Sequence, residues 1–166
     1  MGLGLYSVFV YPIIYIWPAY VANGAPVLFG GGRPLDFGRK LFGKPIFGSH
    51  KTIRGMAAGL AAGTIMAFAE SVFIPYMLPV GILLSVGTMA GDLAGSFVKR
   101  RTGIKEGSKT LLLDQYPFLI FALLFALPFG RTPDVYGLAF LFVLTGALHA
   151  LTNLSAHKLR LKKVPW

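Results

Sequence analysis

Cysteine is absent from this 166-residue sequence, which excludes disulfides, thiolate nucleophiles and cysteine-ligated zinc or iron–sulfur sites. Charge is scarce as well: 13% of the residues are charged, where soluble domains have about 25%, and only 6 residues are acidic. Apolar residues take their place, since 55% of the chain is hydrophobic. The composition therefore predicts an integral membrane protein, with residues 1–166 forming a single membrane-embedded, all-α domain.

Five apolar stretches divide the chain. They are Leu3–Ala22, Arg54–Phe73, Met77–Phe97, Tyr116–Leu127 and Val135–His157. Because a helix needs about 20 residues to cross a bilayer, we expect the short fourth stretch to be tilted or partly sheltered by protein. The first stretch lacks a basic leader, so we do not expect a cleaved signal peptide. The pattern predicts about five transmembrane helices.

The cations lie in the connections between these stretches rather than on a soluble face, so we do not expect nucleic acid as a partner. All but one of the 16 lysines and arginines fall in residues 27–54, 98–115 and 158–166, and the exception is Arg131. Since basic loops stay in the cytoplasm, this asymmetry predicts an outside N-terminus, a cytoplasmic C-terminus and two basic cytoplasmic loops. Polar residues at the cytoplasmic ends of the stretches, Asn23 among them, would then share one cavity.

Asp92 is an acid inside the third stretch. On a helix, Ser96 and Lys99 follow it on the same face, at positions i+4 and i+7. A carboxylate at membrane depth costs at least ~2.5 kcal/mol, so something must compensate it. A Mg²⁺ ion carrying a polyphosphate would do so, with Asp114 as a second carboxylate. The alternatives are an ion pair of Asp92 with a lysine or arginine, and a capping role for Asp114 at the helix that begins near Tyr116.

Lys99, Arg100 and Arg101 form an uninterrupted cationic run. One interpretation is a topogenic cluster beside anionic headgroups. The other is a phosphate clamp, since guanidinium groups bind phosphate bidentately, and the face shared with Asp92 and Ser96 favours it. Consecutive residues on a helix cannot all face one phosphate, so we expect at least one of the three to point elsewhere.

Lys51 and Arg54 open the second stretch, where a helix N-terminus presents free backbone amides and a positive dipole end. No Walker-type P-loop accompanies them. The preceding loop alternates apolar residues with glycines and cations, as an interfacial amphipathic segment does. His149, Asn153 and His157 form an i, i+4, i+8 stripe that favours interhelical hydrogen bonding over catalysis.

Several segments together resemble a known family. The segments are Pro18-Ala-Tyr-Val-Ala-Asn-Gly-Ala-Pro26, Leu35-Asp-Phe-Gly38, Lys51-Thr-Ile-Arg-Gly55, Gly91-Asp-Leu-Ala-Gly-Ser96 and Leu113-Asp-Gln-Tyr-Pro117. They resemble the archaeal CDP-archaeol synthases over nearly the whole chain. The run from Ser96 to Glu106 also resembles the first half of the longer CDP-diacylglycerol synthase pattern, with Glu106 in place of an aspartate. The His-Gly-Gly segment and the second aspartate of that pattern are missing here.

The resemblance implies an Mg²⁺-dependent enzyme that transfers CMP from CTP to the phosphate of an unsaturated di-geranylgeranyl glycerol ether, and it implies no protein partner. Pyrophosphate would be the second product. Together with the residue patterns, it indicates Asp92, Asp114 and Lys99 as catalytic residues, with both aspartates holding the metal. The nucleotide-binding residues would be Asn23, Lys51, Arg54, Ser96, Arg100, Arg101 and Lys105. Two other functions stay open: a CTP-dependent polyprenol kinase, in which His149 would activate a hydroxyl, and a non-enzymatic anion or lipid transporter.

Overall fold

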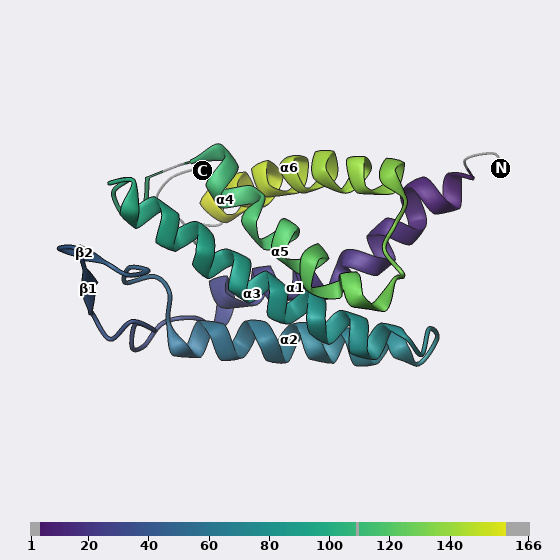
Figure 1. The fold of residues 1–166 in the computed structure, drawn as a ribbon, viewed down its shortest axis with the longest axis horizontal. Helices are drawn as coiled ribbons and strands as arrows, with labels where there is room; N and C mark the ends of the chain where they lie inside the picture. Colours follow the sequence, from purple (N-terminus) through teal and green to yellow (C-terminus); the bar gives the residue numbers. More distant parts are fainter. Residues whose placement is uncertain (1–3, 109, 159–166) are drawn as a thin grey trace.

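The computed structural model describes residues 4–108 and 110–158, and nearly all of its regular structure is helical (Figure 1). The helices are α1 (Tyr11–Phe29) after a π-helical turn η1 (Tyr6–Val10), α2 (Ile53–Ser71), α3 (Met77–Arg101), α4 (Leu111–Gln115), α5 (Pro117–Ala126) before a 3₁₀ turn η2 (Leu127–Phe129), and α6 (Val135–Lys158). A small antiparallel hairpin, β1 (Lys40–Leu41) and β2 (Lys44–Pro45), projects from the connection between α1 and α2.

Four predicted apolar stretches each fall on one helix and the first falls on η1 and α1, but two helices end later than predicted. Helix α1 continues through Pro26 to Phe29, so Asn23 lies inside the helix. Helix α3 continues beyond Phe97 to Arg101, and its last turn carries the three consecutive cations. A run of apolar residues marks only the part of a helix that needs an apolar environment, so its end can precede the end of the helix.

The hairpin departs from the predicted all-α architecture. Its turn has left-handed backbone at Phe42 (φ 50°) and Gly43 (φ 75°), and the turn before β1 has it at Phe37 (φ 52°); a bulky residue is uncommon in this conformation. Phe42, next to Gly43 in the turn between the strands, is 89% exposed. Strands of two residues are too short to produce an alternating pattern, so the sequence gives no signal for them.

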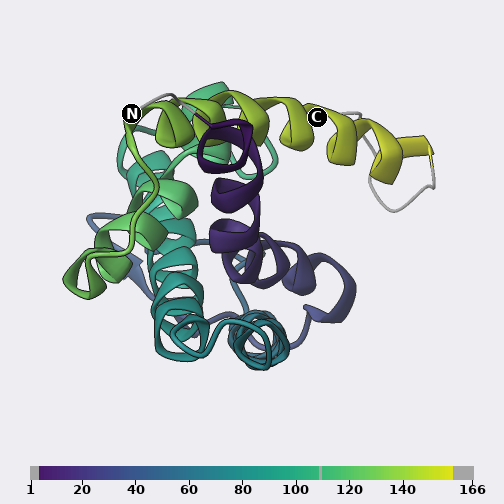
Figure 2. The same cartoon turned by 90° about the vertical axis from the view of Figure 1, so that its right-hand side faces the viewer.

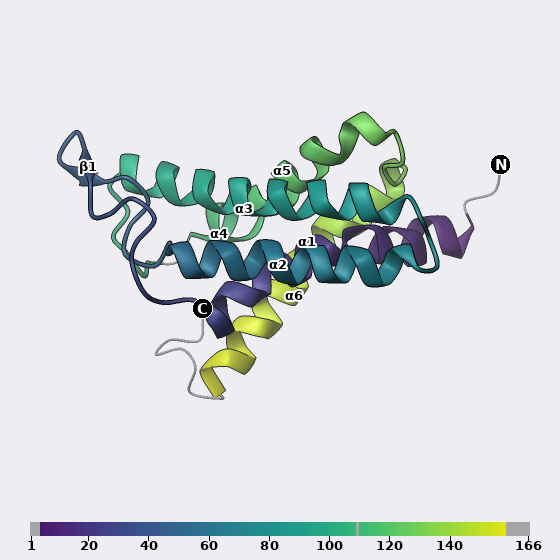
Figure 3. The same cartoon turned by 90° about the horizontal axis from the view of Figure 1, so that it is seen from below.

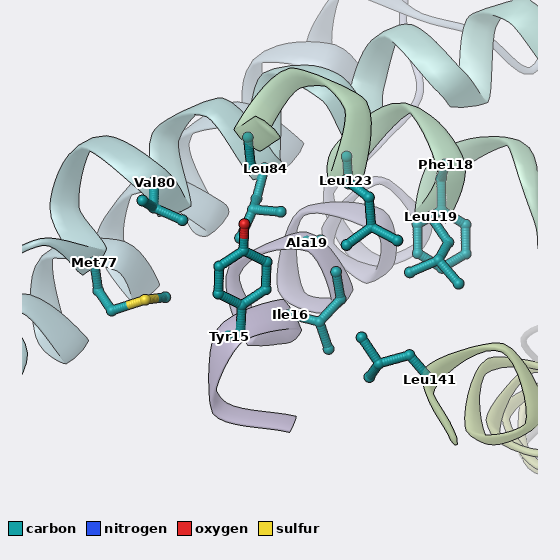
Figure 4. Packing of buried hydrophobic residues seen from close by; sticks show 12 residues of the cluster. Tyr15, Ile16, Ala19, Met77, Val80, Leu84, Phe118, Leu119, Leu123 and Leu141 are labelled. Carbon is teal, nitrogen blue, oxygen red and sulfur yellow. The ribbon is translucent and has the colours of Figure 1, made fainter. Parts of the chain in front are cut away.

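The core lies between α1, α3 and α5, with α6 at its edge (Figure 4). Tyr15 and Ile16 of α1, Leu84 of α3 and Leu119 of α5 are fully buried, and Leu141 of α6 joins them. Where lipid surrounds the helices, close packing rather than exclusion of water stabilises such a core.

Small residues let α2 and α5 approach the two sides of α3. A Cβ atom added at Gly63 of α2 would lie 2.2 Å from Ser85 Oγ and 2.9 Å from Ala22 Cβ. A Cβ atom added at Gly91 of α3 would lie 2.2 Å from the carbonyl oxygen of Pro117 in α5. Gly63 and Gly91 therefore permit close helix packing.

Helix α6 crosses the bundle instead of lying along it. Figure 2 shows α6 across one edge, and Figure 3 shows its C-terminal part extending away from the antiparallel pair α2 and α3. A hydrogen bond of 2.8 Å between the hydroxyls of Tyr20 and Thr145 joins it to α1, and an edge-to-face contact of Phe9 with Phe140 joins it to η1. The hairpin, α4, the start of α2 and the end of α3 meet at one end of the molecule (left in Figure 1).

Two helical segments, Tyr6–Phe29 and Met77–Arg101, are long and apolar enough to cross a membrane. Pro117–Phe129 and Val135–Leu148 are shorter apolar helices. Glu70, near the end of α2, is 8% exposed, and neither of its carboxylate oxygens has a hydrogen-bond partner within the described part of the chain.

Candidate active site

A closed loop between α1 and α2 forms one wall of the site. Its two ends pair in antiparallel fashion: Leu35 N–H donates to the Lys51 carbonyl (2.7 Å), and Ile53 N–H donates to the Arg33 carbonyl (3.1 Å). Thr52 is the N-cap of α2, since its hydroxyl accepts the Gly55 N–H at 3.0 Å. The chain is therefore fixed on both sides of Lys51.

Asp36 holds the middle of this loop. Its buried carboxylate accepts the backbone N–H groups of Gly38 (2.9 Å), Phe47 (3.0 Å) and Gly48 (3.2 Å). Burial opposes the charge of Asp36, but the backbone N–H groups outweigh it and lower the pKa of the carboxyl group. Sequence reasoning missed this role, although an acid two residues before a glycine is a known turn signal.

Lys51 joins the loop to α3. Its Nζ lies 2.6 Å from Asp92 Oδ1 and 2.7 Å from Oδ2, and both side chains are partly buried. The sequence left open whether Asp92 binds a metal or pairs with a cation, and in this structure it pairs with Lys51. Two residues predicted for different roles, the metal ligand and the phosphate ligand, are thus in direct contact.

Lys99 and Asp114 form a second pair of the same kind, with Nζ 2.5 Å from Oδ1. The other oxygen, Oδ2, accepts the Thr110 N–H at 2.8 Å. Asp114 therefore caps the short helix α4, and the alternative prediction that it caps the helix beginning near Tyr116 is wrong. That helix, α5, has no side-chain cap hydrogen bond and begins with Pro117, whose missing N–H needs none.

A cavity of about 110 Å³ lies between the loop and the end of α3. Lys51, Ser96, Lys99 and Arg100 line it, so three cations and a hydroxyl surround one space. His50 lines it as well, and sequence reasoning missed this residue because nothing but its position beside Lys51 marks it.

A second, smaller cavity of about 20 Å³ lies on the other side of Lys51. Asp92 lines it together with apolar residues such as Pro26 and Met89. His50 and Lys51 contribute to both cavities. The pair of Lys51 and Asp92 thus separates a cationic space from a mainly apolar one.

Arg101 does not face the cavities. Its guanidinium donates to the carbonyls of Leu41, Lys44 and Pro45 in the hairpin, and it lies over the Phe97 ring at 5.2 Å. One of the three consecutive cations thus holds the hairpin. Neighbouring Arg100 is 8% exposed, and its Nε has no hydrogen-bond partner within the described residues.

The structure therefore brings together most of the predicted site residues. The group comprises Lys51, Asp92, Ser96, Lys99, Arg100 and Asp114. Asn23, Arg54 and Lys105 line neither of the two cavities. The side chains of His149, Asn153 and His157 lie outside the described part of the chain, as do residues 159–166 of the predicted cytoplasmic tail.

Apolar helices that meet at one end in a cation-lined cavity, with a carboxylate beside each of its two lysines, fit a membrane enzyme that acts on phosphate groups. A family model for CarS-like proteins, the CDP-archaeol synthases, matches residues 5–166. The chain belongs to this family of transferases in archaeal membrane lipid biosynthesis, and the predicted resemblance is confirmed.

Individual relatives agree over nearly the full length. A CDP-archaeol synthase of Methanopyrus kandleri is 44% identical over 170 residues, which covers 100% of this chain and 98% of that protein. One from Pyrococcus horikoshii is 46% identical over 160 residues, covering 92% and 94%. A solved structure of an intramembrane enzyme for archaeal membrane lipid biosynthesis matches with a TM-score of 0.82 at 36% identity, covering 87% of this chain and 93% of that one.

Proposed function

We propose that this protein transfers CMP from CTP to the phosphate of an unsaturated di-geranylgeranyl glycerol ether and releases pyrophosphate. The observation that carries this proposal is the cavity lined by Lys51, Lys99 and Arg100, because cations that converge on one space suit a triphosphate. Membership of the CDP-archaeol synthase family supports the choice of nucleotide and of lipid.

The reaction would be an in-line displacement at the α-phosphorus of CTP. An oxygen of the lipid phosphate forms the new P–O bond, and the bond to the β-phosphate breaks with its electron pair leaving on pyrophosphate. A phosphate monoester is already a nucleophile near neutral pH, so no general base is needed. The residues would mainly hold the two substrates in line and neutralise the charge that grows on the leaving group.

We also propose Mg²⁺ ions at Asp92 and Asp114. Among the described residues, no three histidine or acidic side chains gather into a metal site, so phosphate oxygens and waters would complete the coordination. Hard carboxylate oxygens beside a phosphate-binding cavity fit this ion. When bound, Mg²⁺ neutralises phosphate charge. Lys51 and Lys99, which now contact the two carboxylates, would then be free to bind phosphate oxygens.

The apolar-lined cavity beside Asp92 suggests where the lipid approaches. A cavity of about 20 Å³ holds little more than one water, so the glycerol ether end would pass beside its lining of Pro26, Met56 and Met89 while the isoprenoid chains stay in the bilayer. We further propose that five helices span the membrane and that both basic loops and the active site face the cytoplasm. The single-sided distribution of cations supports this orientation.

Purified protein, CTP, magnesium and lipid phosphate test the proposal directly. CTP labelled at the α-phosphorus should transfer its label to the lipid, with one pyrophosphate released for each CDP-lipid, and a chelator should stop the reaction. Transfer of a γ-label to the corresponding lipid alcohol would indicate the kinase instead. A preparation that forms neither product contradicts both enzymatic functions.

A further inference from the structure

Glu106 occupies an anion site that other parts of the chain form at the edge of the cation-lined cavity. Its Oε2 accepts the backbone N–H of Ser49 (3.2 Å) and the Ser49 hydroxyl (2.6 Å). Its Oε1 lies 3.9 Å from an NH1 nitrogen of Arg100. These hydrogen bonds, with the Arg100 guanidinium and the His50 side chain nearby, lower the pKa of Glu106, although burial opposes them.

Backbone geometry shapes this site for an anion. Gly48 has a φ of 100°, a conformation that favours glycine, and a Cβ atom there would lie 2.8 Å from Glu106 Oε1. A backbone N–H, a hydroxyl and a guanidinium are also the donors that bind phosphate groups in proteins. The Glu106 side chain is 32% exposed, so it lies at the open side of the site and can leave it.

The Arg100 guanidinium has a hydrogen-bond donor that Glu106 does not satisfy. The arginine side chain is 8% exposed, yet its Nε has no hydrogen-bond partner within the described residues, and its contact with Glu106 is long. A buried guanidinium with an unsatisfied donor favours a second, better-matched acceptor. A phosphate group presents more oxygens than one carboxylate and would satisfy it more fully.

We propose that Glu106 is an internal stand-in for a phosphate group of the nucleotide. Its carboxylate holds the position between Ser49 and Arg100, and a phosphate of CTP or of product pyrophosphate takes this position when it binds. Two anions cannot share the site, so Glu106 leaves it and carries the turn around residues 102–107 outward. Because Glu106 competes with the phosphate for the same donors, it weakens nucleotide binding. When Glu106 returns to the site after the reaction, it helps expel pyrophosphate. This inference rests on the proposed function, because it assumes that the cavity binds nucleotide phosphates.

The substitution Glu106→Gln tests the exchange, because glutamine keeps the size and one acceptor oxygen but removes the charge. We expect the full-length variant to bind pyrophosphate about tenfold more tightly than the wild type, on the scale of one charge-assisted hydrogen bond. KM for CTP should fall, and pyrophosphate should become a stronger product inhibitor. Ser49→Ala, which removes the hydroxyl, should instead weaken pyrophosphate binding. Calorimetry on the detergent-purified proteins measures the affinity of each variant for pyrophosphate.

Asp134→Asn is the matched control. It changes the net charge by the same amount, but Asp134 caps α6 through the Gly137 N–H (2.8 Å) and touches neither cavity. Its affinity for pyrophosphate should equal that of the wild type. Melting temperatures of all variants show whether each protein remains folded.

The other outcomes overturn the proposal. Weaker pyrophosphate binding in Glu106→Gln means that the carboxylate is a required ligand or only a structural support, and unchanged binding means that the two anions do not compete. If Glu106→Gln binds lipid phosphate more tightly than the wild type but does not bind pyrophosphate more tightly, the position between Ser49 and Arg100 belongs to the lipid headgroup. The pyrophosphate measurement needs no turnover, so it stays decisive even if the proposed transfer reaction is not observed.

Discussion

Lys51 and Lys99 each hold a carboxylate that the proposed reaction needs for a metal ion. Such a pair keeps a partly buried carboxylate and a lysine satisfied when nothing else is bound to them. If an ion and a polyphosphate enter together, each carboxylate gains a cation and each lysine gains a phosphate. Each of these four charged groups then still has an oppositely charged neighbour after binding, which lowers the electrostatic cost of loading the site.

Asp92→Asn tests the metal-ligand role. Asparagine keeps the shape of the side chain but removes the charge that would hold Mg²⁺, so we expect turnover to fall by about 100-fold or more while the protein stays folded. The measurement is CDP-lipid formation across a magnesium titration. Near-normal turnover with unchanged magnesium dependence would show that Asp92 only pairs with Lys51.

Asp36 gives a prediction about stability and pH. Its pKa is lowered on folding, so its carboxylate stabilises the protein above the unfolded pKa of about 4, and this contribution is lost as the pH falls through the folded value. Asp36→Asn should therefore melt below the wild type at neutral pH, and the two melting temperatures should converge under acid conditions. A constant difference at every pH would contradict an ionised role for Asp36.

At the scale of the elements, the hairpin depends on α3 through Arg101. Two separate nitrogens of the planar guanidinium donate to three carbonyls, a fixed geometry that the compact ammonium of a lysine does not have. Arg101→Ala should therefore expose Arg39 and Lys40 to faster cleavage by trypsin. KM for CTP should change less in this variant than in Lys99→Ala. Equal increases in KM would instead place Arg101 among the phosphate ligands.

The contact of α2 with α3 and α1 should be sensitive to the size of the side chain at position 63. Gly63→Ala places a methyl group 2.2 Å from Ser85 Oγ, so we expect a loss of about 1–3 kcal/mol from overpacking and a lower melting temperature. Gly24→Ala in α1 is the control, because a Cβ atom there meets nothing within 4 Å. A Gly63→Ala variant as stable as Gly24→Ala would contradict the close packing.

Sequence reasoning located the helices and most of the residues that meet around the cavity, but not the way in which the loops are held. Runs of apolar residues locate helices because the apolar surface of a helix comes from residues that are close together in the sequence. The shared face of Asp92, Ser96 and Lys99 follows from helical geometry alone. The partners of Asp36, Arg101 and Glu106 are distant in sequence: Asp36 reaches Gly48, and Glu106 reaches Ser49. No periodicity encodes such contacts, which appear only when the fold brings two loops together.

At the scale of the whole molecule, the polar groups gather at one end of a bundle whose outer surface is apolar. Leu28, Phe68 and Val143, on three different helices, are among many large apolar side chains that are more than half exposed. In water such a surface would drive aggregation, whereas a bilayer covers it without cost. The basic end then lies where anionic substrates and headgroups meet, and the opposite end carries few charges.

The orientation of this bundle is the last prediction, and the absence of native cysteine makes its test clean. Lys105→Cys puts a thiol in the basic loop after α3, and Val72→Cys puts one in the turn between α2 and α3, where the native side chain is 68% exposed. If basic loops face the cytoplasm, an impermeant thiol reagent added to intact cells should label position 72 and not position 105. Opening the cells should make position 105 reactive, which controls for its accessibility. Labelling of position 105 alone in intact cells would reverse the topology and move the proposed active site to the outer face, away from cytoplasmic CTP.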